Sequence, residues 1–493
     1  MNVAEHVRLH GVASRRCLEW VAGAWGLPPG SIPPPELPSA EQKLPRSEAR
    51  AAPRPARTHP AGSGPSVLPG LNVGSREEFV PRRPETLEEA RIDGGLVDGM
   101  IWKLLYLAGS LTSQKLTEEL CVSKKIVVDH VTRMKKQNLV VYTGQRGLMD
   151  FDLTLTDSGR ERARKAFEDS NYIGAMPVQL TDYVAAIAKQ SIGHEKPSRE
   201  RVEAAFSDLL INEQLFDILG PAINSAKGMF LYGFPGNGKT SIAERITRSF
   251  GDDVWIPKAL IIDGIIIKLF DLQNHDPVRI AEDLIYDDRW IKIRRPTILV
   301  GGELTMEQLE IRWDPATRIC EAPLQLKSNC GTLVIDDFGR QKMNPDQLLN
   351  RWIVPLEKRY DFLSLPTGRK IQVPFDQLII FSTNLEPRDL VDDAFLRRIP
   401  YKICVSDPSE EEFRQLFEIM CPKLGFHHDP AQVDYLINTH YWQDGRQVRP
   451  YRCCHPRDLL LQIRNYCTYH NLPIELREEY FDFACSVYFT VMA

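Results

Sequence analysis

One octapeptide constrains the fold of this chain more than any other feature of the sequence. Residues 233–240 read Gly-Phe-Pro-Gly-Asn-Gly-Lys-Thr and fit the pattern G-x-x-x-x-G-K-[ST]. An apolar run, Met229 to Tyr232, precedes the octapeptide, and a helical pattern from Ser241 to Phe250 follows it. A glycine-rich loop between a strand and a helix lets backbone N–H groups surround phosphate oxygens at the positive end of the helix. The sequence therefore predicts a phosphate-binding loop.

The chemistry of such a loop gives several of its residues a role. Lys239 would reach the β- and γ-phosphates of a bound nucleotide, and the Thr240 hydroxyl would bind Mg²⁺. Small residues around them let the phosphates approach the backbone. An ordinary glycine-rich turn is the alternative, and the flanking strand and helix argue against it. The predicted nucleotide-binding residues are Gly233, Pro235, Gly236, Asn237, Gly238, Lys239, Thr240 and Ser241.

A pair of acidic residues ends a second apolar run further along the chain. Leu333-Val334-Ile335 is followed by Asp336 and Asp337. A carboxylate at a strand end near a phosphate loop can hold Mg²⁺ through its water shell, so Asp336 is the second predicted metal ligand. Asp337 would orient and deprotonate the attacking water. Acids often end strands, and this interpretation therefore depends on the phosphate loop upstream.

With these two motifs the sequence resembles the AAA+ ATPases over roughly residues 200–493. The resemblance implies an α/β fold, in which the parallel sheet of a P-loop NTPase is sandwiched by helices and followed by a C-terminal helical lid. It also implies a homo-oligomeric ring, usually hexameric, that binds ATP with Mg²⁺ and hydrolyses ATP at the interfaces between subunits. The second acid is usually glutamate in that superfamily. Asp337 stands there in this chain, as in bacterial replication initiators and helicase loaders.

Further positions match the pattern of the superfamily. Asn384 follows an apolar run and matches sensor 1, which senses the γ-phosphate and positions water. The segment from Asp392 to Arg398 resembles the arginine-finger segment, whose finger reaches the neighbouring subunit's site. Arg398 is the first choice for this finger and Arg397 the second, while two surface arginines that close a helix are the alternative. Arg457 opens a lid helix and matches sensor 2, which closes over the γ-phosphate. The predicted catalytic residues are Lys239, Asp337, Asn384, Arg398 and Arg457.

The N-terminal part of the chain has a different composition. Residues 28–69 hold 12 prolines in 42 positions, and such a segment buries too little apolar surface to offset its ordering entropy. The chain divides into five predicted parts, of which composition marks the first and the resemblance to AAA+ ATPases implies the last two. These are a disordered Pro-rich region (1–83), a winged-helix-like domain (84–170), a connector (171–200), a P-loop ATPase core with insertions (201–407) and a helical lid (408–493).

The elements expected between residues 84 and 170 resemble a winged helix-turn-helix, an α+β module. Apolar spacing predicts helices at 99–107 and 114–120, a third helix capped by Ser123, strands at 139–142 and 151–155, and a helix at 158–168. Thr112 or Ser113 would cap the second helix, and a turn would span 144–147. The third helix carries five basic residues and one acid, as a DNA-recognition helix would. From Leu96 to Glu168 the count is 12 basic and 9 acidic residues, a net +3, so a protein-contacting module is the alternative.

Two segments exceed what a minimal core needs. One lies between the helix of the phosphate loop and Asp336, and the other, residues 361–375, is predicted to be a hairpin around Pro366-Thr367-Gly368. This layout is similar to that of MoxR-type and enhancer-binding AAA+ proteins, which use such insertions to grip a partner protein at the pore of the ring. The resemblance therefore implies remodelling of an unidentified protein partner. A DNA-directed ATPase, acting through the winged helix, and a nucleotide-gated switch with little hydrolysis are the alternatives.

The overall composition limits the setting of the protein. Lys and Arg number 61 against 66 Asp and Glu, a formal net charge of −5, which excludes a uniformly basic nucleic-acid coat. No uninterrupted apolar run reaches about 18 residues, so no membrane insertion is expected. The 10 cysteines form no CxxC pair, and a reduced cytoplasmic location is predicted.

Overall fold

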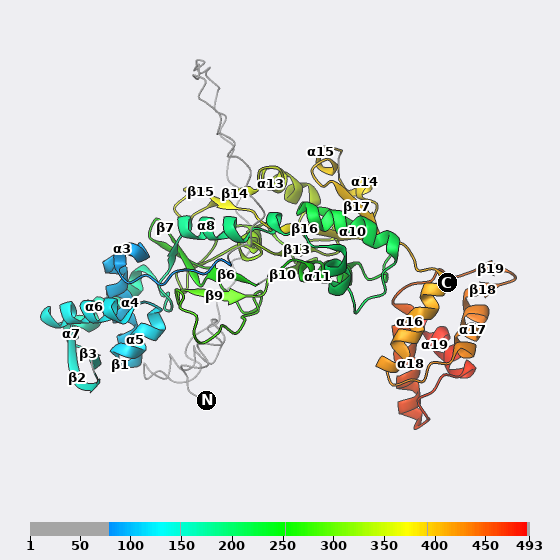
Figure 1. Cartoon of the computed structure of the whole chain (residues 1–493), viewed down its shortest axis with the longest axis horizontal. Helices are drawn as coiled ribbons and strands as arrows, with labels where there is room; N and C mark the ends of the chain where they lie inside the picture. The colour runs from blue at the N-terminus through cyan, green and yellow to red at the C-terminus, as the bar shows by residue number, and fades with distance from the viewer. Residues whose placement is uncertain (1–77, 148, 252, 392, 491–493) are drawn as a thin grey trace, which may run out of the picture. The chain divides into compact units, whose positions relative to one another are not determined.

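The computed structural model describes residues 78–147, 149–251, 253–391 and 393–490. Most of the region predicted to be disordered, 1–83, lies outside these ranges. Figure 1 shows the described elements, coloured from blue at the N-terminal end to red at the C-terminal end. Among the described helices, none combines the length and the apolar character that crossing a bilayer requires.

A parallel sheet of five strands lies at the centre of the residues around the phosphate loop. Every strand pairing in it is parallel, so the carboxyl ends of the strands share one edge. The α/β class with a parallel sheet is therefore confirmed. In spatial order the strands are β10 (Thr297–Val300), β13 (Thr332–Ile335), β16 (Leu378–Thr383), β5 (Met229–Tyr232) and β17 (Tyr401–Cys404).

Helices cover both faces of this sheet, as an all-parallel sheet requires. Met229 and Leu231 of β5 pack with α9 (Arg199–Ala205), α10 (Glu213–Ser225) and α11 (Lys239–Ser249). Phe230, which points to the other face, packs with the buried residues of α13 (Pro345–Lys358). Because both faces of the sheet are buried, its strands are apolar along their whole length. The packing on both faces also holds β5 in place, and with it the start of the loop that follows.

Helix α10 corrects one expectation from the sequence. The dipeptide Gly220-Pro221 is a typical signal for a break between elements, yet α10 continues through this pair to Ser225. Leu219, Ala222 and Ile223 are fully buried on the inner face of the helix. Their packing outweighs the hydrogen bond that a proline inside a helix removes.

A second, mixed sheet is built mainly from the insertion between α11 and β13. Its spatial order is β11 (Arg312–Asp314), β12 (Ile319–Glu321), β8 (Ile265–Lys268), β7 (Ala259–Ile262) and β4 (Val178–Gln179). Within the insertion, residues 259–270 contain β7 and β8, and residues 290–300 contain β9 (Trp290–Ile293) and β10. Strand β9 pairs with β6 (Val254–Pro257).

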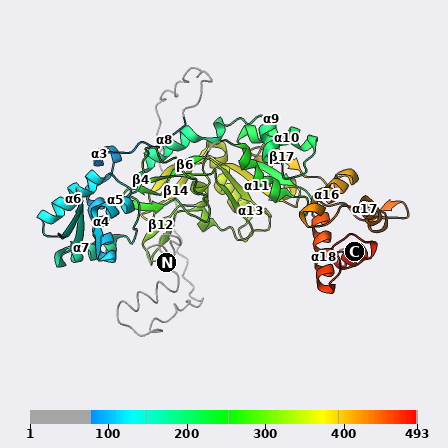
Figure 2. The same cartoon turned by 60° about the horizontal axis from the view of Figure 1, so that its bottom comes forward.

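The segment 171–200 contributes to this second sheet, although the sequence suggests a connector. Strand β4 pairs with β7, and the following helix α8 (Leu180–Gln190) lies alongside β6 (Figures 1 and 2). Tyr183 of α8 is fully buried, and its hydroxyl donates to the carbonyl of Leu326 over 3.0 Å. The segment is therefore packed into the body of the insertion.

The hairpin predicted at 361–375 is present as β14 (Tyr360–Ser364) and β15 (Lys370–Pro374). Gly368 lies in its turn with a φ of 82°, which favours glycine. Leu363, Ile371 and Val373 are buried in the same cluster as residues of β7 and β8. One face of the hairpin is thus covered by the second sheet, and its tip, residues 366–370, is exposed.

The N-terminal domain contains the predicted helices and the two predicted strands in the predicted order, together with a short strand, β1 (Ser110–Thr112), that was not predicted. In chain order the elements are α4 (Gly94–Ala108), β1, α5 (Ser113–Leu120), α6 (Lys124–Lys136), β2 (Val140–Gly147), β3 (Asp150–Leu155) and α7 (Asp157–Asp169). Thr112 and Ser123 cap α5 and α6, as expected. The turn predicted at 144–147 is wrong, because β2 continues to Gly147 through two register shifts against β3. The assignment of the whole N-terminal domain as a winged helix remains a prediction from the order of its elements.

This domain shares a hydrophobic core with the second sheet. Ala259 and Ile266 belong to the same buried cluster as the core residues of α4, α5 and α6. The buried Arg289, paired with Asp287, donates to the carbonyl of Ala90 over 3.1 Å. The N-terminal domain is therefore packed against the insertion.

The C-terminal domain is helical, as predicted. Its described helices include α16 (Glu410–Lys423), α17 (Pro430–Leu436), α18 (His455–His470) and α19 (Glu478–Tyr488). Helices α16, α17 and α18 are labelled in Figure 2. Ser409 and Glu412 form a capping box at the start of α16. Buried aromatic residues fill the domain's own core, among them Phe413, Phe417 and Phe481.

Candidate nucleotide-binding site

The predicted phosphate loop joins β5 to α11, and its shape depends on glycine. Gly233, Gly236 and Gly238 have φ values of 136°, 87° and 81°, a region that other residues rarely adopt. A Cβ on Gly233 would lie 2.4 Å from the carbonyl oxygen of Val405, closer than any real contact. Gly238 is the N-cap of α11, so the positive end of the helix points at the loop.

Lys239 is buried within the loop at 7% exposure. Its Nζ donates to the carbonyl oxygens of Gly233 and Phe234, each over 2.9 Å, and to Asn384 Oδ1 over 2.6 Å. Burial lowers the pKa of Lys239, and the neighbouring Asp336 and Asp337 oppose that shift. The carbonyls hold the ammonium in place, at the site where phosphates would approach.

The acidic pair lies directly beside the loop. Thr240 Oγ1 donates to Asp336 Oδ2 over 2.8 Å, and Asn384 Nδ2 donates to Asp337 Oδ1 over 3.3 Å. Since β16 lies between β5 and β13 in the sheet, Asn384 at its end bridges the loop and the acids. The structure thus brings together Lys239, Thr240, Asp336, Asp337 and Asn384.

A cavity of about 720 Å³ opens over these residues, a volume within the range of small-molecule sites. Residues 235–241, the acidic pair, Asn384 and Arg457 all line it. Gly233 does not line the cavity, and its carbonyl accepts a hydrogen bond from Lys239 Nζ instead.

The residues predicted to hold Mg²⁺ suit that ion. A hydroxyl and a carboxylate oxygen 2.8 Å apart are hard oxygen donors, which Mg²⁺ prefers. The described residues contain no group of three or more His, Cys, Asp or Glu side chains arranged for a metal. Mg²⁺ commonly takes few protein ligands and completes its shell with waters and phosphate oxygens, so Thr240 and Asp336 fit it.

An anchor that the sequence does not reveal ties the loop to the start of α18. The buried Asn237 donates from Nδ2 to Asp407 Oδ1 over 2.6 Å, and Asp407 also pairs with Arg452. The backbone N–H of Cys454 donates to the carbonyl of Gly236 over 2.9 Å. The Asn237 side chain therefore holds the loop to Asp407, and the Gly236 carbonyl holds it to the start of α18.

Apolar side chains also line the cavity, and the sequence offered no sign of this role. They come from the segment before the phosphate loop and from α16. Ile218 and Ile419 are 49% and 39% exposed, which distinguishes them from ordinary core residues. The apolar lining residues are Leu209, Leu210, Ile211, Leu215, Ile218, Leu416, Ile419 and Met420.

The three predicted arginines have different surroundings. Arg457 lines the cavity, and its side chain pairs with Asp458 over 2.8 Å. Arg398 does not line the cavity, and its Nε lies 3.7 Å from Glu357 Oε2. Arg397 is exposed, and Asp392, at the start of their segment, falls outside the described residues.

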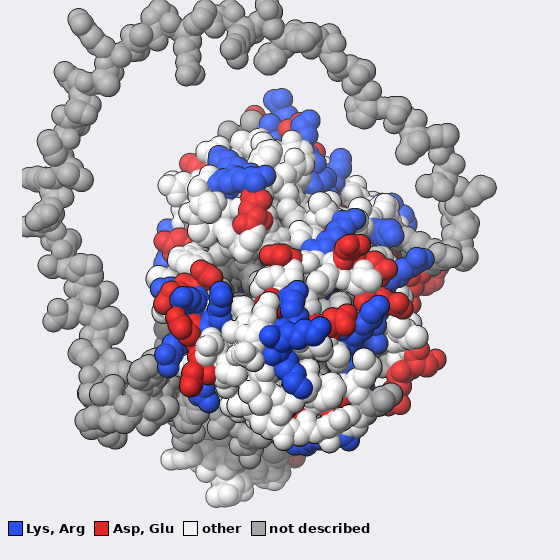
Figure 3. Space-filling view, turned by 90° about the vertical axis from the view of Figure 1, so that its left-hand side faces the viewer, with Lys and Arg blue, Asp and Glu red and all other residues white. Residues whose placement is uncertain are grey.

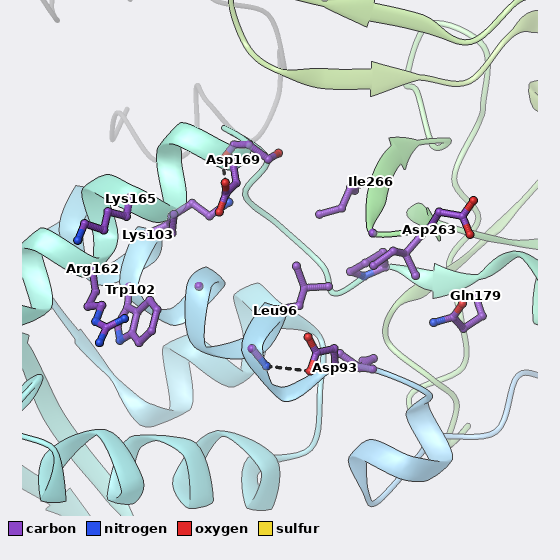
Figure 4. Close-up of a pocket in the computed structure, with 18 residues that line it drawn as sticks. Asp93, Leu96, Trp102, Lys103, Arg162, Lys165, Asp169, Gln179, Asp263 and Ile266 are labelled. Atoms are coloured by element: carbon purple, nitrogen blue, oxygen red, sulfur yellow. Dashed lines mark hydrogen bonds between the residues drawn. The ribbon is translucent and has the colours of Figure 1, made fainter. Parts of the chain in front are cut away.

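A second cavity of about 750 Å³ lies where α4 and α7 face the β7–β8 hairpin. Figure 4 shows Lys103 and Asp169 on one side of it and Gln179, Asp263 and Ile266 on the other. Lys103 Nζ donates to the carbonyls of Ser170 and Tyr172 over 2.8 and 3.1 Å, and burial lowers its pKa to about 8. Lys103 thereby fastens the chain that leaves α7, a structural role.

The basic residues of α6 are only partly available to a partner. Arg133 pairs with Asp98 over 2.6 Å, and Lys135 Nζ lies 3.8 Å from the centre of the Tyr142 ring. Lys125 and Lys136 are exposed. Over the face seen in Figure 3, Lys and Arg atoms are interspersed with Asp and Glu atoms. This mixed surface differs from the one-signed surface of a strongly basic module.

Comparison with known proteins gives one partial family match. Residues 409–487, which contain the C-terminal helices, match a family described as a domain of unknown function (DUF8689). A search of curated protein sequences finds no match to the chain.

Several solved structures resemble the chain at low sequence identity. NtrX from Brucella abortus is 13% identical with a TM-score of 0.36, over 57% of this chain and 56% of that one. The chain thus spans little more than half the length of NtrX. The Thermotoga maritima RuvB Holliday junction branch migration motor is 12% identical with a TM-score of 0.34, over 60% and 73%. A complex between subunits BchI and BchD of magnesium chelatase gives 14%, a TM-score of 0.32, and coverage of 58% and 94%. At this level of likeness they do not identify an activity for this chain.

Proposed function

We propose that this protein is an AAA+ ATPase that binds Mg·ATP in the cavity over the phosphate loop and hydrolyses it. The observation that carries the proposal is the chain of contacts from Lys239 through Asn384 to Asp337, with Thr240 bonded to Asp336 beside it. These residues stand at the carboxyl edge of neighbouring parallel strands, where open α/β sheets bind their ligands.

The cavity suggests how ATP would lie. The apolar lining around Ile218 and Ile419 suits the adenine base, and the loop and α11 suit the phosphates. Thr240 and Asp336 would hold Mg²⁺, which when bound stabilises the negative charge on the phosphate oxygens. Asp337, kept in place by the amide of Asn384, would accept the proton of the attacking water.

The proposal includes a homo-oligomeric ring, by resemblance hexameric, whose sites are shared between subunits. Arg398 lies outside the cavity of its own chain, which is compatible with a finger that acts on a neighbour, and Arg397 is the second choice. The ring would remodel a protein partner. One face of the β14–β15 hairpin is buried against the second sheet. The part of the hairpin that would contact the partner is therefore its exposed tip at residues 366–370.

The test is ATP turnover per subunit, measured against protein concentration for the wild type, Lys239→Ala and Arg398→Ala. We expect wild-type turnover per subunit to rise with concentration and both variants to lose it. Wild-type protein that binds ATP yet stays inactive at every concentration would contradict the motor and favour a nucleotide-gated switch. Full activity of Arg398→Ala would move the finger to Arg397.

DNA binding through the N-terminal domain is the second candidate function, favoured by the exposed Lys125 and Lys136 on α6. The test uses the full chain and double-stranded DNA at several salt concentrations. Phosphate contacts predict an affinity that falls steeply with salt, and a weaker salt dependence in the Lys125→Ala/Lys136→Ala double variant. Equal affinity of this variant and the wild type would exclude α6 as the DNA-contacting surface.

A further inference from the structure

The loop after β13 carries an arginine that the motif assignments leave without a role. Arg340 follows Asp337 by three residues, and it lines the same cavity as Lys239, Asp336 and Asn384. Arg340 is also exposed.

A tight turn brings Arg340 back beside the acidic pair. The backbone N–H of Arg340 donates to the carbonyl of Asp337 over 2.9 Å, and a four-residue turn of this kind keeps its end residues within about 7 Å. Gly339 has a φ of 100°, which the third position of a type II turn requires. A Cβ there would lie 2.6 Å from Leu390 Cδ2.

The rest of the loop is anchored on both sides of Arg340. Gln341 accepts from the Gly339 N–H over 2.9 Å and donates to the Asp336 carbonyl over 3.4 Å. The Phe338 side chain is fully buried, and its backbone N–H donates to Ser382 over 2.7 Å. Because the backbone is fixed on both sides, the Cα of Arg340 has a defined position at the cavity.

The charges in the cavity single out Arg340 among its lining arginines. Arg457 is paired with Asp458 over 2.8 Å, which neutralises much of its charge. Arg340 makes no ion pair with any carboxylate in the described part of the chain. Lys239 is already bonded to two loop carbonyls and to Asn384. Of the lining guanidinium groups, Arg340 is therefore the one whose charge is not already matched.

We infer that Arg340 contacts the γ-phosphate of ATP bound to its own subunit and stabilises the charge that develops there during hydrolysis. The inference rests on the proposed function. The water oxygen bonds to the γ-phosphorus while the bond from that phosphorus to the bridging oxygen breaks. The bridging oxygen leaves with its electron pair on ADP, and the water proton passes to Asp337. A planar guanidinium suits two phosphate oxygens at once.

The experiment compares Arg340→Ala and Arg340→Lys with Lys342→Ala. Lys342 lies in the same loop, is exposed and does not line the cavity. Lys342→Ala therefore removes one positive charge from the loop, as Arg340→Ala does, but removes none from the cavity. Two quantities are measured for each variant. These are kcat for ATP, and the affinity for ADP relative to a non-hydrolysable ATP analogue with nitrogen between the β- and γ-phosphates.

Arg340→Ala is expected to lower kcat at least about 100-fold and to lose the preference for the ATP analogue over ADP. Its ADP affinity should stay unchanged, which demonstrates an intact fold. Arg340→Lys should keep part of the preference, since the charge remains without the fork. Lys342→Ala should behave as the wild type. Wild-type kcat and nucleotide preference in Arg340→Ala would overturn the inference.

A mixing experiment separates action on the own site from action on a neighbour's site. Lys239→Ala subunits lack the phosphate-loop lysine but keep Arg340. If Arg340 serves its own subunit, adding them to Arg340→Ala subunits restores no turnover. Restored turnover would overturn the inference, because the added subunits would then supply the arginine across the interface. Failure of the proposed function is distinct: the wild type would then show no ATP turnover, while the preference for the analogue over ADP still tests Arg340.

Discussion

Asn384 Nδ2 donates to Asp337 Oδ1 over 3.3 Å. The direction of this amide is fixed, because its oxygen accepts from Lys239 over 2.6 Å and a lysine ammonium can only donate. The Asn384 nitrogen must then face the carboxylate of Asp337, which can only accept when ionised. One side chain thus orients the proposed base relative to the proposed phosphate-binding lysine.

Replacing Asn384 with alanine should therefore slow hydrolysis more than it weakens binding. Asp337 would lose its donor, and a misplaced reacting group commonly costs roughly 100-fold in rate. Lys239 would keep both loop carbonyls, so ATP affinity should change little. Steady-state kinetics and nucleotide titration check this, with the exposed Asn350→Ala on α13 as control. An equal loss of affinity and rate in Asn384→Ala would assign Asn384 to binding.

The hydroxyl of Thr240 should be needed for Mg²⁺. Thr240→Val keeps the shape of the side chain but removes the oxygen that now bonds to Asp336. The Mg²⁺ concentration for half-maximal ATP turnover should rise at least about 10-fold. Thr240→Ser, which keeps the oxygen, should stay near the wild-type value. A valine variant with an unchanged Mg²⁺ requirement would remove Thr240 from the metal site.

The anchor of the phosphate loop should matter for both stability and nucleotide affinity. Asp407→Asn weakens the bonds to Asn237 and Arg452, and loss of a charged hydrogen bond costs about 1–3 kcal/mol. We expect a lower unfolding temperature and weaker ADP binding. Asp444→Asn is the matched control, because Asp444 is exposed and has a φ of 50° that asparagine tolerates. If both variants unfold alike, the anchor contributes nothing measurable.

The parts of this structure that follow from the sequence are those with local signals. Thr112, Ser123 and Ser409 cap helices through bonds to residues three positions on, so the pattern of nearby residues reveals them. The phosphate loop and the acidic pair follow for the same reason, because each is flanked by an apolar run. The resemblance implied a parallel sheet, and this sheet brings Asn384 into contact with the phosphate loop and the acidic pair.

The parts that the sequence did not reveal depend on distant contacts. Strand β4 is only Val178–Gln179, and it exists because β7, far along the chain, pairs with it. Asp407 carries no motif, and its role arises only when Asn237 and Arg452 meet it. Gly220-Pro221 has the local signal of a break, which the burial of its neighbours overrides.

His455 should make the protein sensitive to acid. Burial, helped by the charge of Arg452 and opposed by Asp458, lowers the pKa of His455 from 6.5 to about 4. Between pH 6.5 and pH 4, His455 is protonated in the unfolded chain but neutral in the folded chain. Stability from this group is therefore complete above pH 6.5 and is lost as the pH falls toward 4. From pH 7 to pH 5 the loss is about 2 kcal/mol.

The measurement is urea unfolding of the C-terminal helices, followed at pH 7 and pH 5 in the full chain. His455 lies against Phe413 and Phe489, and its Nδ1 is 2.9 Å from the Tyr441 hydroxyl. Phenylalanine fills a similar space without titrating, although it leaves that hydroxyl without its partner. His455→Phe should therefore be less stable at pH 7 and should lose less stability on acidification than the wild type. His440→Phe, which replaces an imidazole whose Nε2 lies 2.8 Å from Asp482 Oδ1, is the control. The same pH dependence in His455→Phe and the wild type would assign the acid sensitivity to other groups.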